Sequence, residues 1–180
     1  MTLEQLANIG ELIGGLAVVA SLIYLAIQIR QNTKIVKGAT LSSNTQNWTN
    51  VISSVTHPEM AAAHLVGSMG RAAISSEQFT QFFYHCRIFF VAFEDQYYQF
   101  RHGTLDEAIY RGYERSIQAQ ALVSPGYLMY WEISRQEFSP EFANRIDALI
   151  KDNPNKDPSY LLSKWRELSA GNYPDSSSDN

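Results

Sequence analysis

LIGGLAVVASLIYLAIQI, residues 12–29, decides how this chain is built, because it holds no charged residue over eighteen positions. The hydrocarbon core of a bilayer is about 30 Å thick, and a helix of this length covers about 27 Å at about 1.5 Å per residue. Ile9 and Gly10 extend the apolar run across Glu11 to the full thickness. The sequence therefore predicts a transmembrane helix over about residues 9–29.

The charges on either side give this span a direction. Glu4 and Glu11 precede it with no Lys or Arg, unlike the basic start of a cleaved signal peptide. Arg30, Lys34 and Lys37 follow it, and the positive-inside rule makes that side cytoplasmic. We expect these three residues to set the topology of a single-pass protein of the cell inner membrane, with the N-terminus outside and the C-terminal domain in the cytoplasm.

Small residues form one face of the span: Gly10, Gly14, Ala17 and Ser21. Such a face lets helices approach closely in a bilayer, so it is a candidate helix–helix contact for a homo-oligomer. Gly and Ala are also common in spans that have no partner. A further alternative is a soluble helical protein that buries the whole stretch, since eighteen residues lie at the length where the two cases are confused.

The length and composition of the chain after the span indicate one domain. Of 180 residues, about 140 remain after the span, the size of an ordinary domain, and 45% hydrophobic with 12% aromatic residues are enough for a core. The net charge is −4 and no basic cluster follows Lys37, which argues against nucleic-acid binding. Cys86 is the one cysteine, so the chain has no intramolecular disulfide.

Helical periodicity with no strand pattern predicts an all-α protein. We expect the transmembrane helix to continue over about 3–55 as a stalk, with poor helix propensity in the Ser- and Asn-rich section 42–50. The expected divisions are the tail, span and basic segment at 1–37, the stalk at 38–57, the bundle at 58–169 and a disordered tail at 170–180. Within the bundle, helices are expected at 58–69, 76–102, 105–122, 125–137, 140–151 and 158–169.

Local start and stop signals set these bounds. Ser75–Gln78 and Thr104–Glu107 have the spacing of capping boxes, and Gly70 and Gly103 lie where helices end with a left-handed residue. A proline at the first helical position follows a residue expected at the N-cap four times, at His57-Pro58, Ser124-Pro125, Ser139-Pro140 and Asp157-Pro158.

The helix expected at 76–102 is the centre of the bundle. Its apolar face is predicted at Phe79, Phe83, Cys86, Phe90, Phe93, Tyr97 and Phe100, widened by Phe82 and Phe89. Short connections make neighbouring helices antiparallel. The facing apolar stripes are expected at Leu105, Ile109, Tyr113 and Ile117; Tyr127, Trp131 and Phe138; Phe142, Ile146 and Leu149; and Leu161, Trp165 and Leu168. An aromatic stripe of this kind is far more often a core than a pocket for a lipid, a haem or another flat ligand.

Glu94, Tyr98 and Arg101 form a candidate buried polar site on that helix. A half-buried carboxylate among aromatics can act as an acid or base, in a pocket lined also by Tyr97. The alternative, which we favour, is a structural ion pair or hydrogen bond inside the bundle. Its candidate arginine partners are Arg87, Arg101, Arg111 and Arg115.

Other motifs predict no catalytic residue, cofactor or metal. The histidines at 57, 64, 85 and 102 lack the spacing of metal ligands, and no Cys-x-x-Cys occurs. Cys86 falls on the apolar face, where an inert thiol is expected, and no Gly-x-Ser-x-Gly, P-loop or dinucleotide fingerprint is present. The sequence thus favours a non-enzymatic protein.

Several blocks together resemble a family of short, uncharacterised bacterial proteins. They are IGELIGGLAVVASLIYLAIQIRQNTK, FEDQYYQFRHGTLDEAIY, SPGYLMYWE and FSPEF, which span the chain to about residue 150. Where similar proteins often have a Trp-Trp pair, this chain has Tyr130-Trp131. The resemblance implies a bacterial origin, an N-terminal anchor and a small helical domain, and it carries over no activity.

Three hypotheses follow. In the first, the chain is a membrane-anchored domain that recruits, scaffolds or regulates an unknown protein partner. In the second, it is a membrane-associated enzyme or ligand-binding protein with a pocket near Glu94. In the third, it is a soluble helical protein with a buried apolar helix. The sequence names no ligand, no partner and no oligomeric state.

Overall fold

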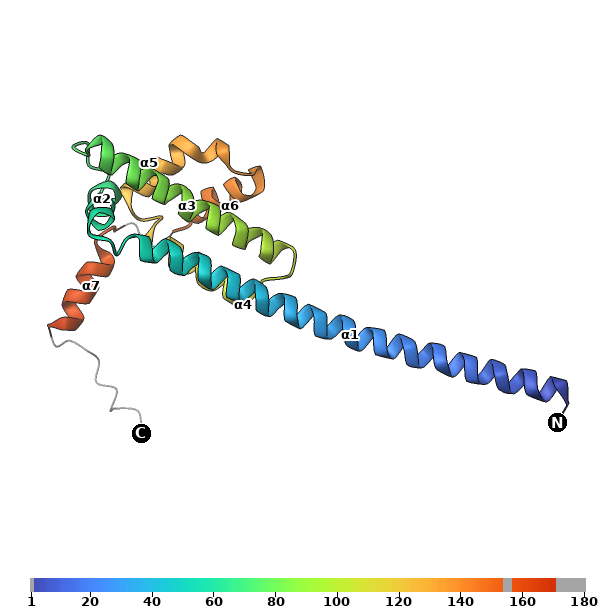
Figure 1. The fold of residues 1–180 in the computed structure, drawn as a ribbon. Coiled ribbons are helices and arrows are strands. Elements are labelled where there is room, and N and C mark those ends of the chain that lie inside the picture. The colour runs from blue at the N-terminus through green and yellow to red at the C-terminus, as the bar shows by residue number, and fades with distance from the viewer. Residues whose placement is uncertain (1, 154–156, 171–180) are drawn as a thin grey trace. The chain divides into compact units, whose positions relative to one another are not determined.

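The computed structural model of the protein describes residues 2–153 and 157–170, which form helices joined by short turns, with no strand among them (Figure 1). The predicted all-α class is confirmed. The helices are α1 (Leu3–Ser54), α2 (Pro58–Ser68), α3 (Ser76–Arg101), α4 (Glu107–Gln120), α5 (Pro125–Ser134), the 3₁₀ helix η1 (Arg135–Glu137), α6 (Pro140–Lys151) and α7 (Tyr160–Ser169).

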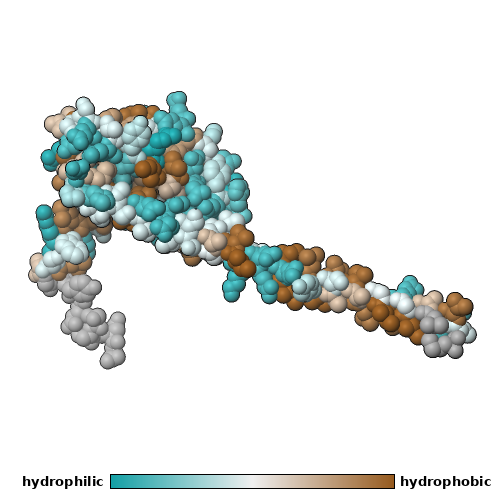
Figure 2. Space-filling model, in the orientation of Figure 1, coloured by the Kyte–Doolittle hydropathy of each residue, from teal (hydrophilic) through white to brown (hydrophobic). Residues whose placement is uncertain are grey.

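The contacts divide the chain into two units, Met1–Ser43 and the part from Asn44 onward. The first unit is the N-terminal part of α1. An 18-residue window of this helix is long and apolar enough to cross a membrane, and none of it is buried. Leu16, Val18 and Ile23 each expose about 60% of their surface, and brown apolar residues are prominent along this part in Figure 2.

The second unit begins inside α1. Asn44 is buried, and its Nδ2 donates to Oε1 of Gln99 at 2.6 Å. Trp48 meets the ring of Phe89 edge to face at a centroid distance of 5.3 Å, and Val51 is buried in the core. The residues from Asn44 therefore belong to the bundle, although the sequence places them in the stalk. α1 continues without interruption through the Ser- and Asn-rich section.

α3 is the central helix of this unit, and α2, α4 and α5 pack against it. Its buried residues are Phe82, His85, Cys86, Phe89, Phe90, Phe93, Gln96 and Tyr97. The sequence predicts most of this face, but Phe79 is 48% exposed, so its assignment to the core is wrong. The buried face is centred nearer Phe82 and Phe89, which leaves Phe79 at its margin, and it includes two polar residues.

The other stripes agree with the expected pattern as far as α6. Phe142 and Ile146 of α6 are fully buried, and Tyr127 and Trp131 of α5 are nearly so. In α7 the expected stripe is not buried: Leu161 is 50% and Trp165 72% exposed. The tail expected at 170–180 lies, except for residue 170, outside the described residues.

Several of the expected caps are present. Ser75 and Gln78 form the capping box of α3, and Gly70 and Gly103 have φ angles of 64° and 73°. Prolines stand at the starts of α2, α5 and α6, but the residues before them make no side-chain cap hydrogen bond there.

Two expected helix starts are wrong. α4 is capped by Asp106 and not by Thr104, because the Asp106 carboxylate accepts from the Ala108 N–H. α7 begins at Tyr160, two residues after Pro158, because the Asp157 carboxylate accepts from the N–H and hydroxyl of Ser159 and holds a turn there.

Two glycines let α2 and α5 touch backbone to backbone. A Cβ at Gly126 would overlap the carbonyl oxygen of Gly67, and a Cβ at Gly67 would overlap the ring of Phe82. At Gly112, in the middle of α4, a Cβ would meet no atom within 4 Å outside its chain neighbours and the backbone of its own helix. Gly126, which is tightly packed, and Gly112, which is not, allow the effect of a Gly→Ala substitution to be compared at the two sites.

We expect Gly126→Ala to lower the free energy of unfolding by roughly 1–3 kcal/mol, because the new methyl group must push α5 away from α2. Gly112→Ala should raise the free energy of unfolding by roughly 0.5–1 kcal/mol, because alanine lowers the conformational entropy of the unfolded chain. Denaturant unfolding followed by near-ultraviolet circular dichroism measures both. Equal effects of the two substitutions would contradict the close approach.

Candidate functional site

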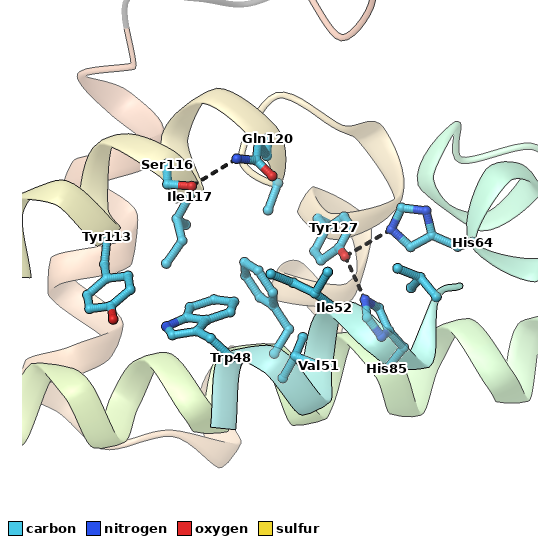
Figure 3. A pocket seen from close by; sticks show the side chains of 13 residues that line it. Trp48, Val51, Ile52, His64, His85, Tyr113, Ser116, Ile117, Gln120 and Tyr127 are labelled. Atoms are coloured by element: carbon cyan, nitrogen blue, oxygen red, sulfur yellow. Dashed lines mark hydrogen bonds between the residues drawn. The ribbon is translucent and has the colours of Figure 1, made fainter. Parts of the chain in front are cut away.

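A cavity of about 340 Å³ lies between the C-terminal part of α1 and helices α2 to α5 (Figure 3). Ile52, Ser116 and Gln120 are exposed at its rim, whereas Ile117 and Tyr127 are buried. The full lining is Trp48, Val51, Ile52, Val55, His64, His85, Phe89, Tyr113, Ser116, Ile117, Gln120, Ala121 and Tyr127. None of these thirteen residues is Asp, Glu, Lys or Arg.

Three polar side chains from three helices meet at one end of the cavity. The hydroxyl of Tyr127 on α5 lies 3.2 Å from Nε2 of His64 on α2 and 3.0 Å from Nε2 of His85 on α3 (Figure 3). On its other side, His85 Nδ1 lies 3.3 Å from Oγ of Ser54. The Ser54 hydroxyl also lies 2.7 Å from the carbonyl oxygen of Val51, to which it donates.

One assignment of protons satisfies all four of these contacts. Since the Ser54 hydrogen is given to Val51, Nδ1 of His85 must carry a hydrogen and donate to Ser54. Neutral His85 then has an unprotonated Nε2, which accepts from the Tyr127 hydroxyl, and His64 Nε2–H donates to the Tyr127 oxygen. The result is a one-way chain of hydrogen bonds from α2 through α5 and α3 to α1.

Local sequence places these side chains. The Ser124-Pro125 start puts Tyr127 in the first turn of α5, where it packs edge to face on Phe82 at a centroid distance of 5.5 Å. Gly126 brings that turn against the α2 backbone, which carries His64. The tight α2–α5 contact therefore brings the Tyr127 hydroxyl within reach of His64.

Burial sets the charge of this group. Desolvation, together with the neighbouring His64, lowers the pKa of His85 to about 4. Desolvation also lowers the pKa of His64 and raises the pKa of Tyr127. All three side chains are therefore neutral at pH 7, as the hydrogen-bond assignment requires.

This arrangement is poorly suited to acid–base or nucleophilic chemistry. A histidine with a pKa of about 4 is a weak base at pH 7, so the contact between Ser54 and His85 does not activate the hydroxyl. The described residues contain no group of three or more His, Cys, Asp and Glu able to hold a metal ion. The cavity is better suited to non-covalent binding.

The structure places the predicted polar site away from this cavity. Glu94 Oε1 accepts from the backbone N–H of Ser139 at 2.9 Å, and the Tyr98 hydroxyl donates to Ser139 Oγ at 2.8 Å. Ser139 is the N-cap of α6, so the two α3 residues hold the start of that helix. Arg101 instead bonds the Tyr97 hydroxyl at 2.9 Å and pairs with Glu141 at 3.1 Å.

The other predicted residues lie on the N-terminal part of α1. A Cβ at Gly10 or Gly14 would meet no atom within 4 Å outside its chain neighbours and the backbone of its own helix. The hydroxyl of Ser21 donates to the carbonyl oxygen of Ala17 at 2.8 Å. Arg30, Lys34 and Lys37 are exposed on the same helix, C-terminal to the apolar run. Helix pairing and topology stay predictions.

Sequence reasoning missed the group formed by His64, His85 and Tyr127. The available signal is that His85 and Gln96 lie in register with Phe82, Phe89 and Phe93, at steps of three and four. A polar residue in such a register enters the core and needs a partner. His64 gives no comparable signal, because its partner comes from a helix sixty-three positions later.

Comparisons of the chain with protein-family models, curated proteins and solved structures found no match.

We expect the free energy of unfolding to fall as the pH drops from about 6.5 to about 4. Unfolded His85 binds a proton near its ordinary pKa of 6.5, whereas the folded residue resists protonation until about pH 4. The contribution of neutral His85 to the free energy of unfolding is therefore fully present above pH 6.5. Its loss between pH 6.5 and pH 4 is on the order of 3 kcal/mol. Urea unfolding at successive pH values measures this slope.

His85→Gln should flatten that slope, and His64, which titrates in the same direction, should account for part of what remains. His57→Gln is the matched control, because His57 is exposed and lies before α2. If His57→Gln flattened the slope as much as His85→Gln, the assignment to the buried group would be wrong.

We expect Glu94→Leu to lower the free energy of unfolding by roughly 1–2 kcal/mol, because the N–H of Ser139 loses its acceptor. Glu94→Gln should have a smaller effect, since an amide oxygen can still accept that bond. Glu132→Leu, at an exposed position of α5, is the control. Thermal unfolding curves distinguish this capping role from a functional carboxylate, whose loss would leave stability unchanged.

Proposed function

We propose that the chain is a single-pass protein of the cell inner membrane that holds a helical domain in the cytoplasm. The observation that carries the proposal is the apolar window of α1, of which no part is buried against the described protein. An apolar helix of this length left in water would be a large exposed patch of the kind that marks membrane or protein contact. A bilayer covers all of its sides at once.

Two alternatives fit this helix less well. The core helix of a soluble protein would be mostly buried, and this window is not. A cleaved signal sequence would end near the apolar run, whereas α1 continues as one helix to Ser54 and its last turns pack in the bundle. Both features support a permanent anchor.

The proposed direction rests on charge. Glu4 and Glu11 precede the uncharged run at residues 12–29, and Arg30, Lys34 and Lys37 follow it. A basic segment within about 15–20 residues of a span stays in the cytoplasm. The bundle then lies in the cytoplasm. A single buried thiol and the lack of a disulfide are consistent with that reducing compartment.

The proposed role is recruitment, scaffolding or regulation through protein contacts. The bundle exposes an apolar stripe along α3 at Tyr84, Ile88 and Val91, which are spaced as one helical face and expose 59%, 58% and 46% of their surface. Met129 and Ile133 of α5 are also exposed. Exposed apolar residues in a helical row are typical of a protein-contact surface. Pairing through the small-residue face of α1 is a further element of the proposal.

Single-cysteine labelling tests the topology. Cys86 is buried and its thiol pKa is raised by burial, so the unaltered chain should resist a maleimide. In spheroplasts, a membrane-impermeant maleimide should label Thr2→Cys from outside, whereas Arg71→Cys, in the turn after α2, should be labelled only after lysis. The reverse pattern would overturn the direction. Release of the chain by carbonate wash would overturn the anchor.

Replacing the basic trio tests what sets the direction. Arg30→Gln, Lys34→Gln and Lys37→Gln together should make part of the Arg71→Cys population accessible from outside, because the charge asymmetry is lost. The same three changes should leave the carbonate-resistant fraction unchanged, since the apolar run is intact. An unaltered labelling pattern would mean that these residues do not set the topology.

A further inference from the structure

We propose that the cavity between α1 and α2–α5 binds a small uncharged molecule with an apolar body and a hydroxyl group, an alcohol or a phenol. This inference concerns the bundle alone and goes beyond the anchoring and protein contacts proposed above. It rests on the size of the cavity, the chemistry of its lining and an unused hydrogen-bond acceptor in that lining.

The size suits a small organic molecule. Ligand pockets commonly measure about 300–1,000 Å³, and the volume of about 340 Å³ lies at the lower end of that range. It equals on the order of ten water volumes of ~30 Å³ each. One or two rings with a short substituent fit such a space, whereas a full lipid does not.

The walls are apolar and partly aromatic. The ring of Trp48 lies between Phe89, met edge to face at 5.3 Å, and Tyr113, stacked at 6.0 Å. Val51 and Ile117 supply buried aliphatic surface. Flat aromatic and branched aliphatic walls together favour a hydrocarbon body of similar flatness.

The lining discriminates against charge. With no Asp, Glu, Lys or Arg among its residues, the cavity offers no ion partner to a carboxylate, sulfonate or ammonium group. Burying an unpaired charge is far more unfavourable than burying a hydroxyl. His64 and His85 supply polar atoms without supplying charge, so the preferred ligand is neutral.

An unused hydrogen-bond acceptor points to a hydroxyl. In the proton assignment above, the Tyr127 oxygen donates one bond to His85 and accepts one from His64, which leaves it a second lone pair. Tyr127 is buried and is one of the lining residues, so the spare acceptor belongs to the lining. A hydroxyl on a ligand is an uncharged group that can donate to it.

The rim provides a way to close the site by mutation. Ile52 of α1 is 61% exposed at the rim, so Ile52→Trp adds bulk at the mouth without disturbing buried packing. Ser116 of α4, also exposed at the rim, allows a second closing variant, Ser116→Trp. Ile133 of α5 is 67% exposed and does not line the cavity, so Ile133→Trp is the matched control.

The test uses the full chain in lipid nanodiscs and three probes with one ring system: 1-naphthol, naphthalene and 1-naphthalenesulfonate. Equilibrium dialysis at pH 7, with empty nanodiscs as the blank, measures binding to the protein. We expect 1-naphthol to bind, naphthalene to bind about tenfold more weakly because it makes no hydrogen bond, and the sulfonate to show no saturable binding.

Ile52→Trp and Ser116→Trp should each weaken 1-naphthol binding at least tenfold, while Ile133→Trp leaves it unchanged. Tyr127→Phe should reduce the preference for 1-naphthol over naphthalene. Near-ultraviolet circular dichroism verifies that each variant is folded. The proposal is overturned if 1-naphthol does not bind, if both closing variants bind as the parent does, or if the sulfonate binds as tightly as 1-naphthol.

Discussion

The need to cover the aromatic face of α3 is the constraint on which the rest of the bundle depends. Phe82, Phe89, Phe90 and Phe93 form one face that covers about 100° of the helix circumference and runs along about three turns, so more than one neighbouring helix contributes to its burial. Helices α2, α4 and α5 pack against α3, and Trp48 of α1 closes a further side at Phe89. Rings of this size bury 150–250 Å² each, which makes their coverage the largest favourable term in the fold.

Dispersion and hydrophobic burial alone would allow those neighbours to slide, and the polar residues of α3 fix their positions. His85 reaches Tyr127 of α5, and Glu94 holds the N-cap Ser139 of α6. Farther along the helix, Gln99 accepts from Asn44 of α1. Each bond satisfies a group that would otherwise be buried without a partner, so losing the correct register has a free-energy cost.

The sequence predicts the elements of this fold better than the contacts between them. Periodicity and prolines place the starts of α2, α3, α5 and α6 correctly, because those signals are local. They misplace Phe79, since the rotation of a helix depends on its neighbours. They also fail for α7, whose amphipathic pattern does not reveal whether a partner surface within the chain covers it.

The same distinction explains the candidate sites. Glu94 is identifiable from the sequence as a carboxylate beside an aromatic face, but its partner is a backbone N–H and not one of the four arginines considered. The group around Tyr127 joins residues from α2, α3 and α5, and its geometry depends on the glycine contact between α2 and α5. No local pattern encodes a meeting of three helices.

A cavity of about 340 Å³ in a bundle otherwise filled by large rings calls for a physical reason. Larger side chains at Ala121 or Val51 could reduce it, and cavity filling is among the easier ways to stabilise a protein. The lining instead combines small aliphatic residues with a hydrogen-bonded chain whose two histidines are kept neutral by burial. A molecule that binds only the folded state would restore part of the lost packing, in proportion to the logarithm of its concentration relative to its dissociation constant. Under the proposed binding of a neutral hydroxyl-bearing molecule, part of the packing stability that the cavity forgoes is returned as binding free energy.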